Sequence, residues 1–241
     1  MDLCRRAGAG IHIHVAEDAA DQRDAEALFG IRVIHRLAEA GALTNDALLA
    51  HCIHLNKAEL AIVRESGAAV AHNPTSNMNN SVGHAPVGLL GDRVALGTDG
   101  LGADMFAESR AAYFRARDAD VFTAIGWPLA RLAEGARLVG RIFGQPRLGG
   151  IEVGAPADLA VLEYPAPTPL TGNNLAGHWM FGLDAGHVRD VVVAGELVVA
   201  DGRSTRADQD KLIAEGAASA ERLWRRLQEI DPHEFHPAGG E

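Results

Sequence analysis

Four segments of this 241-residue chain end in side chains that can bind a metal ion or carry a proton. His14 and Glu17 close IHIHVAE, His51 closes ALLAH, His72 closes AAVAH, and Asp99 closes RVALGTD. Histidine and carboxylate are ligands for a borderline divalent ion such as Zn²⁺, and a nearby unligated carboxylate can move protons. These residue types therefore predict a metal site able to activate water.

Helical stretches separate these segments. We predict helices near 25–40, 57–67, 105–117 and 122–143. The helix over 57–67 has clear ends, because Asn56 can cap it, Glu59 can reach back to the cap and Gly67 can end it. Short strands alternating with helices predict βα units around a parallel sheet. Because catalytic groups of a parallel barrel lie at the carboxyl ends of its strands, we expect the four segments to converge there.

The two ends of the chain differ from this βα pattern. DLCRRAGAG is typical of the last turn of a helix, which favours a chain that begins part-way through its fold. After Gly144, short valine-rich strands are joined by Gly, Ala-Pro and Asp-Gly turns and predict a small β module. Residues 211–230 predict an amphipathic helix, and His233 and His236 in the tail are expected to be solvated.

Composition limits which binding partners, and which residue types as metal ligands, are expected. The chain has 22 Lys and Arg against 32 Asp and Glu, a net charge of -10, so nucleic acid is not an expected partner. No apolar run approaches the roughly 20 residues of a membrane-spanning helix, so no membrane partner is expected and we predict a cytoplasmic protein. Cys4 and Cys52 lack a CxxC spacing, so any metal is expected on histidine and carboxylate.

Taken singly, these signals have simpler interpretations. A lone His51 at the end of a strand is more often a hydrogen-bonded core residue, and Asp99 in GTDG can cap the following helix. Their agreement in position, rather than any one residue, favours a functional site.

The motifs HVAE, AHCIHL, AHNPTSNM and LGTDG occur in that order, and in them the chain resembles the amidohydrolase superfamily, in the branch of deaminases and triazine chlorohydrolases. SNMNNSVG, LGTDGLGADMF and PTPLTGNNLAGH resemble the SsnA-type aminohydrolases. The resemblance runs from about residue 11 to about residue 226. It implies an α/β fold: the later half of a metal-dependent (β/α)8 barrel over 1–147, the C-terminal part of a small β-sandwich over 148–205, and a C-terminal helix and tail over 206–241.

The resemblance also implies a set of site residues. His14 would be the metal ligand of the fifth barrel strand and Glu17 the proton shuttle. His51 would contact substrate or the attacking water, and in some members of the family the metal. Asp99 would bind the metal and accept a proton from water. The implied cofactor is one divalent metal, Zn²⁺ or alternatively Fe²⁺.

Two further positions are implied less directly. His72 and Asn77 lie where the seventh-strand loop of the family faces substrate. The HxH of IHIH has the spacing of the family's first-strand ligand pair, but only three βα units follow it, so we place it on the fifth strand. His12 is then expected to have a packing or supporting role. The family's first-strand pair and its first four barrel strands have no counterpart in these residues.

The function implied is hydrolysis of a C–N bond, such as deamination of a heterocyclic amine, with a small-molecule substrate. Two alternatives stay open. One is a chlorohydrolase with the same site. The other is a non-catalytic fragment or assembly partner, because half a barrel leaves a strand edge and an apolar face uncovered. A homo-oligomer or a complementing N-terminal segment would cover them.

Overall fold

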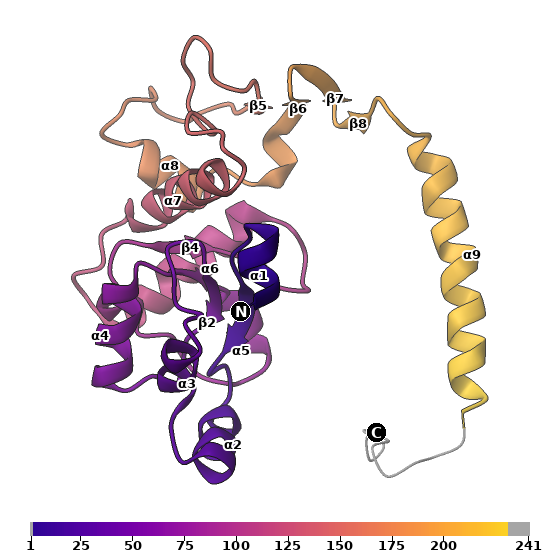
Figure 1. Ribbon diagram of the computed structural model, residues 1–241. Helices are drawn as coiled ribbons and strands as arrows, with labels where there is room; N and C mark the ends of the chain where they lie inside the picture. Colours follow the sequence, from indigo (N-terminus) through magenta and orange to yellow (C-terminus); the bar gives the residue numbers. More distant parts are fainter. Residues whose placement is uncertain (1, 231–241) are drawn as a thin grey trace.

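The computed structural model describes residues 2–230, and its first part is a parallel α/β unit (Figure 1). A four-stranded sheet has the order β1-β2-β3-β4, and each neighbouring pair is parallel. Its strands are β1 (His12–Val15), β2 (Leu48–His51), β3 (Ala69–His72) and β4 (Val94–Leu96). The predicted strands and their parallel pairing are confirmed.

Helices connect and flank these strands. They are α1 (Asp2–Ala7), α2 (Ala19–Phe29), α3 (Val33–Glu39), α4 (Lys57–Ser66), α5 (Pro74–Asn79), the 3-10 turn η1 (Val87–Leu89), α6 (Met105–Ala119) and α7 (Trp127–Ile142). The predicted ends of α4 are confirmed: Asn56 and Glu59 form a reciprocal capping box, and Gly67 ends the helix with φ 73°. Glycine adopts this left-handed backbone conformation without steric cost.

The helix predicted over 25–40 is wrong in its boundaries. The structure has two helices there, because Gly30 adopts φ 72° and ends α2, and Arg32 is extended before α3 begins. The first of them begins at a capping box made by Asp18 and Asp21. The helix predicted from residue 122 begins instead at Trp127, with Pro128 in its first turn, where a missing N–H costs nothing.

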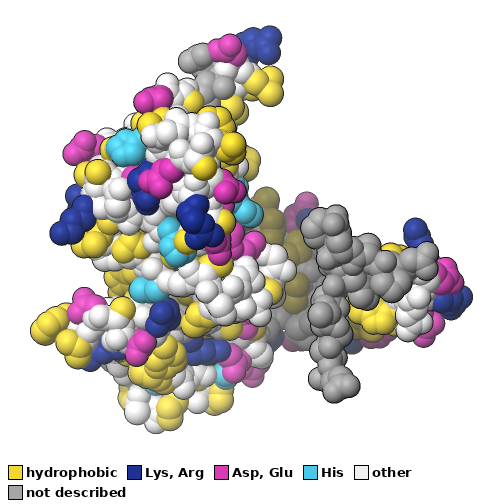
Figure 2. Space-filling model, turned by 90° about the horizontal axis from the view of Figure 1, so that it is seen from below, with side chains coloured by type: hydrophobic (Ala, Val, Ile, Leu, Met, Phe, Trp, Pro, Cys, Tyr) yellow, Lys and Arg dark blue, Asp and Glu magenta, His cyan; other side chains and the backbone are white. Residues whose placement is uncertain are grey.

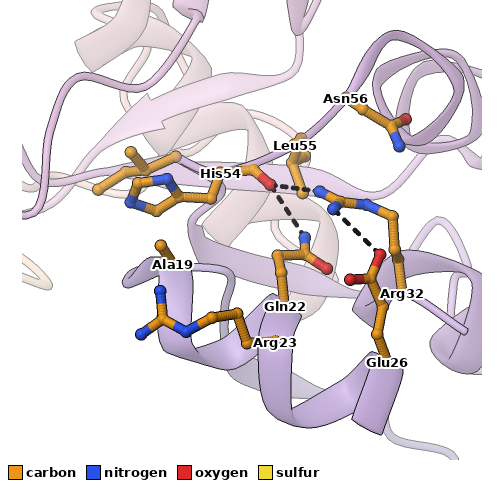
Figure 3. Close-up of a pocket in the computed structure, with 9 residues that line it drawn as sticks. Ala19, Gln22, Arg23, Glu26, Arg32, His54, Leu55 and Asn56 are labelled. Carbon is orange, nitrogen blue, oxygen red and sulfur yellow. Dashed lines mark hydrogen bonds and ion pairs between the residues drawn. The ribbon is translucent and has the colours of Figure 1, made fainter. Parts of the chain in front are cut away.

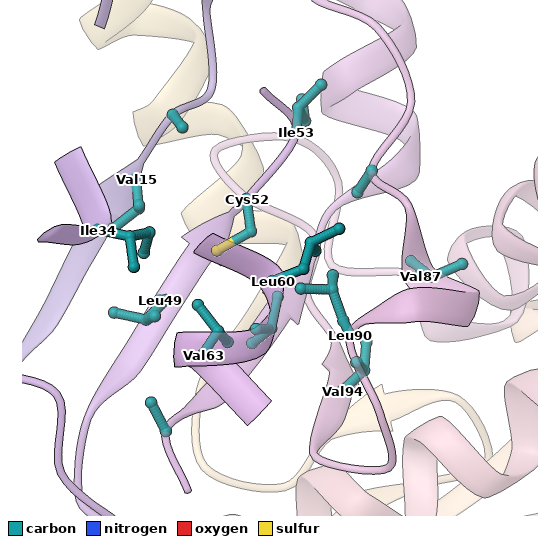
Figure 4. Close-up of a cluster of buried hydrophobic side chains, with 14 of the residues drawn as sticks. Val15, Ile34, Leu49, Cys52, Ile53, Leu60, Val63, Val87, Leu90 and Val94 are labelled. Atoms are coloured by element: carbon teal, nitrogen blue, oxygen red, sulfur yellow. The ribbon is translucent and has the colours of Figure 1, made fainter. Parts of the chain in front are cut away.

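The core lies between one face of the sheet and the helices (Figure 4). Leu49, Val70 and Val94 are paired in register across three strands, so their side chains share one face, and all are almost fully buried. Ile34 from α3, and Leu60 and Val63 from α4, cover them. The next residue in each strand turns to the opposite face. That row consists of His14, Ala50, Ala71 and Ala95.

A small antiparallel sheet follows the α/β unit. Its strand order is β5-β6-β7-β8, and its strands are β5 (Leu159–Leu162), β6 (Val188–Val193), β7 (Glu196–Ala200) and β8 (Arg203–Ser204). Helix α8 (Leu175–Phe181) and the 3-10 turn η2 (Ala185–His187) lie between β5 and β6 in the chain. The domain boundary predicted at 147/148 falls between α7 and β5.

The last described helix, α9 (Gln209–Gln228), stands apart from the rest of the molecule in Figure 1 and buries none of its residues. Large apolar side chains are exposed elsewhere too, including Leu28, Phe29 and Phe122 (hydrophobic side chains are yellow in Figure 2). Among residues 2–230, no helix combines the length and the apolar character needed to cross a membrane. His233 and His236 lie outside the described residues.

Candidate metal and catalytic site

Three of the predicted site residues converge beyond the carboxyl ends of β1 and β2. Potential ligand atoms of His14, Glu17 and His51 all lie within 4.8 Å of one another. His51 Nε2 is 3.4 Å from Glu17 Oε2, and His14 Nδ1 is 3.9 Å from the same oxygen. The two imidazole rings are edge-on, with centroids 5.1 Å apart. The parallel strands thus deliver groups from separate βα units to one point, as expected.

Asp99 follows β4, the strand at the opposite edge of the sheet from β1, and approaches this cluster at His51. Its Oδ2 lies 3.9 Å from His51 Nε2. The hydroxyl of Ser76 donates to Oδ2 at 2.6 Å, and the Gly100 N–H donates to Oδ1 at 2.8 Å. These two hydrogen bonds lower the pKa of the Asp99 carboxyl, and the bond from Ser76 has the larger effect. The carboxyl is therefore ionised at neutral pH.

Unusual backbone conformations aim these side chains. Strand alternation would turn His51 to the same face as the core residue Leu49. Instead His51 has φ 73° and Cys52 has φ 52°, and the ring meets Glu17. Asp99 likewise has φ 53°. Left-handed backbone at residues other than glycine costs free energy and is found preferentially at functional sites.

His51 provides the test of whether a metal ion fits. The side chain is fully buried, and its Nε2 has no hydrogen-bond partner among the described residues. Its Nδ1 lies 2.8 Å from Asn77 Oδ1. A buried imidazole nitrogen that faces the carboxylates of Glu17 and Asp99, with His14 alongside, matches the nitrogen and oxygen donors that Zn²⁺ prefers. The residues present therefore fit a divalent cation.

Two residues predicted to face substrate have other contacts. Asn77 is 2% exposed, and its side-chain oxygen contacts His51. His72 is fully buried, with its ring centroid 6.1 Å from that of His84 and 6.5 Å from that of Trp127. Burial lowers the pKa of His72 to about 3, so this histidine is neutral at physiological pH. That His72 and Asn77 face substrate stays a prediction.

Two residues around the site were missed at the sequence level. Ser76 holds Asp99, and Asn80 Nδ2 donates to Glu17 Oε1 at 3.3 Å and to Ser76 Oγ at 3.4 Å. Both lie in the motif AHNPTSNMNN, which carried part of the family resemblance. His12, expected to pack or to support the site, is exposed.

Two pockets flank α2. One, of about 390 Å³, includes His14 and Glu17 together with Leu28, Phe29 and Arg36. It adjoins the candidate site and offers both apolar and charged walls.

The other pocket, of about 480 Å³, is lined by residues of α2 and of the loop after β2 (Figure 3). Here the side chains of Gln22 and Arg32 both donate to the carbonyl of His54. Arg32 also lies 3.5 Å from Glu26. None of the four site residues lines this pocket, so we do not assign it to the chemistry.

Comparison with known proteins assigns this chain to a family. A family model described as the amidohydrolase family matches residues 1–198. The chain belongs to the amidohydrolase family. The expectation drawn from HVAE, AHCIHL and LGTDG is confirmed at this level.

Similar amidohydrolase sequences are deaminases about twice as long as this chain. It is 32% identical over 223 residues to a 5'-deoxyadenosine deaminase from Methanopyrus kandleri, covering 90% of this chain and 52% of the relative. It is 36% identical over 215 residues to a 5-methylthioadenosine/S-adenosylhomocysteine deaminase from Nitratidesulfovibrio vulgaris, covering 85% and 48%. The chain therefore spans about half the length of the curated relatives it matches.

Solved structures show the same partial match. An adenosine deaminase from Xanthomonas campestris with bound zinc superposes with a TM-score of 0.82 at 28% identity, covering 95% of this chain and 53% of that one. A mutant of the atrazine chlorohydrolase from Arthrobacter aurescens superposes with a TM-score of 0.77 at 23% identity, covering 90% and 50%. At this lower identity the likeness shows the fold alone.

Proposed function

We propose that this chain carries part of the active site of a zinc-dependent aminohydrolase that deaminates an adenosine-type nucleoside. The observation that carries the proposal is the buried, unpartnered Nε2 of His51, which faces the carboxylates of Glu17 and Asp99. The names of the deaminase relatives at 30% identity and above supply the substrate class. The finer resemblance to SsnA-type enzymes stays a prediction.

In this proposal His14, His51 and Asp99 would hold the metal. Zn²⁺ bound there would supply Lewis acidity, which makes a nearby water easier to deprotonate. Asp99, kept ionised by Ser76 and Gly100, accepts a proton from the attacking water. Glu17 is 22% exposed and can pass a proton to the ring nitrogen or the departing amine.

We also propose that the four-stranded sheet is the later half of a (β/α)8 barrel and needs a complementing segment for activity. Its support is the outer strand β1, which pairs with β2 alone among the described strands. His14 on β1 is 68% exposed, although we assign it as a ligand. A segment that adds strands beside β1 would bury His14 and supply further ligands. A second copy of the chain is the alternative complement.

The chlorohydrolase alternative has weaker support. The chlorohydrolase structures share the fold at 23–24% identity, whereas the deaminase relatives are more similar in sequence. The experiment that follows also tests the alternative that the chain is not catalytic.

The test joins this chain to the portion of the Methanopyrus kandleri relative that it does not match. The joined protein is given Zn²⁺ and adenosine, 5'-deoxyadenosine or 5-methylthioadenosine, and ammonia release is measured. We expect turnover that Glu17→Gln lowers by about a hundredfold or more, since positioned acid–base groups contribute 10²–10⁴-fold. Glu65→Gln, an exposed carboxylate on α4, is the matched control and should leave turnover unchanged.

Absence of ammonia release from every nucleoside by a folded, zinc-loaded joined protein would contradict the deaminase assignment. Release by the chain alone at the rate of the joined protein would contradict the need for a complement. Chloride release from a chlorotriazine without nucleoside deamination would instead support the chlorohydrolase.

A further inference from the structure

One short helix, α5, contacts three members of the site. Asn77 reaches His51, Ser76 reaches Asp99, and Asn80, which caps the helix, reaches Glu17. We propose that Ser76 and Asn77 are positioning residues, which set the tautomer of His51 and the orientation of the Asp99 carboxylate before metal or substrate binds. The inference rests on the proposed function, because it assigns what these two side chains do for that site.

The contact of Asn77 determines where the imidazole proton lies. A side-chain carbonyl oxygen only accepts hydrogen bonds, so the Nδ1 of His51, 2.8 Å from Asn77 Oδ1, must carry the hydrogen. In the neutral ring, Nε2 then carries the lone pair. That nitrogen faces Glu17 and Asp99, which is the direction from which a cation would be bound. Asn77 therefore selects the tautomer that can act as a ligand.

The backbone conformation of His51 and the burial of both side chains favour this hydrogen bond. His51 is left-handed at φ 73°, and its ring leaves the pattern of the strand before it. A histidine and an asparagine that are both at least 98% buried would each lose a hydrogen bond to water, so their mutual contact offsets part of that cost. The ring is thus held by the loop conformation and by Asn77 together.

Ser76 acts in the same way on Asp99. The carboxylate accepts Ser76 Oγ–H on Oδ2 and the Gly100 N–H on Oδ1, so both oxygens are fixed. Oδ2, the oxygen bound by Ser76, is also the one 3.9 Å from His51 Nε2. Hydrogen bonds to ligand groups from surrounding residues orient them and commonly change metal affinity by 10–100-fold when lost.

Helix α5 has a further anchor besides these contacts. The buried carboxylate of Glu108 on α6 accepts the N–H of Thr75 at 3.1 Å, and Pro74 begins the helix. Substitution of Asn77 can therefore change the tautomer of His51 while the helix stays in place. This separation makes a local test feasible.

The role of Asn77 is tested by measuring the tautomer of His51 in the metal-free chain. Long-range ¹H–¹⁵N spectra of the ¹⁵N-histidine-labelled chain, recorded at a mildly alkaline pH, distinguish the two ring nitrogens. The signals of His51 are identified by their loss in His51→Gln. We expect the Nδ1–H tautomer in the unsubstituted chain and in Asn77→Asp, which keeps an acceptor, and a mixture of tautomers in Asn77→Leu.

Asn79→Leu is the matched control, because Asn79 is exposed on the same helix and should leave the spectrum unchanged. An Nε2–H tautomer in the unsubstituted chain would overturn the inference without any variant. An unchanged tautomer in Asn77→Leu would overturn it as well. If Asn77→Leu fails to fold, Asn77→Ala, which also lacks the side-chain acceptor, takes its place with the same expected mixture of tautomers.

Ser76 is tested by metal affinity. Zn²⁺ binding to the chain is measured by competition with a chelator. We expect Ser76→Ala to raise the dissociation constant roughly tenfold or more, and Ser76→Thr, which keeps the hydroxyl, to restore it. Equal affinities for Ser76→Ala and the unsubstituted chain would remove Ser76 from the proposal.

These measurements separate the inference from the proposed function. The spectra and the affinities need no substrate, so they stand even if the joined protein releases no ammonia. Conversely, deamination by the joined protein with an Nε2–H tautomer at His51 would leave the function intact and end the inference.

Discussion

His72 links stability to pH. Burial lowers its pKa from 6.5 to about 3, so the folded chain keeps it neutral. The unfolded chain binds a proton near pH 6.5, and because the unfolded state then holds more protons, stability falls as pH decreases through the window between those two values. Above that window the contribution is fully present.

We therefore expect the unfolding free energy to fall between about pH 7 and about pH 5, with His72 accounting for about 2 kcal/mol of the decrease. His72→Gln should lose this part of the decrease, whereas His12→Gln, at an exposed position, should keep it. Urea unfolding at both pH values measures the difference. An identical pH dependence in His72→Gln and the unsubstituted chain would show that the buried ring is protonated after all.

At this scale the sequence identified which residues meet but not all of their contacts. His14, Glu17, His51 and Asp99 were expected together because each ends a segment of one parallel sheet. The contact between Asn77 and His51 was not predictable, since it depends on a left-handed histidine. Strand alternation points the ring the other way, and no residue pattern marks the exception.

The N-terminus of α4 offers a comparison between a cap and a buried charge. Asn56 Oδ1 accepts the Glu59 N–H at 3.0 Å. The fully buried Glu59 also accepts from Arg32 at 2.8 Å and from Gln22 at 3.2 Å, and these contacts join α2 and α3 to α4. Losing Glu59 should therefore cost more than losing the cap.

We expect Asn56→Ala to lower the unfolding free energy by about 1 kcal/mol. Glu59→Ala should lower it by about 3 kcal/mol, because Arg32, Gln22 and the capped N–H groups lose their partner. Glu65→Ala, exposed on the same helix, should stay within about 0.5 kcal/mol of the unsubstituted chain. Chemical denaturation of the three variants tests the order, and equal losses for Asn56→Ala and Glu59→Ala would contradict it.

Element boundaries were predictable where capping residues stood at both ends. Asn56, Glu59 and Gly67 defined α4 from the sequence. The break between α2 and α3 was missed because Gly30 lies inside an apparently continuous helical pattern. Glycine is nevertheless the residue that most often ends a helix in a left-handed conformation, as Gly30 does here. Helix α5 was missed because a six-residue segment is too short to show helical periodicity.

Over the whole molecule, apolar surface is distributed unevenly. The core of the α/β unit is closed on the helix-facing side of the sheet, whereas α9 exposes Ile213, Trp224 and Leu227. The helix also carries charged residues, with Asp210 and Glu215 toward its start and Arg225 and Arg226 in its last turn. No contact inside the described residues buries it, so α9 contributes little to the stability of this chain.

We expect removal of residues 206–241 to change the thermal midpoint of the α/β unit by no more than about 2 °C, since helix α9 buries no residue. Leu49→Ala is the comparison, because Leu49 is fully buried and its loss should cost about 2–5 kcal/mol and lower the midpoint by roughly 5 °C or more. Circular dichroism during heating measures both. A truncated chain that melts as early as Leu49→Ala would show that α9 packs on the α/β unit in solution.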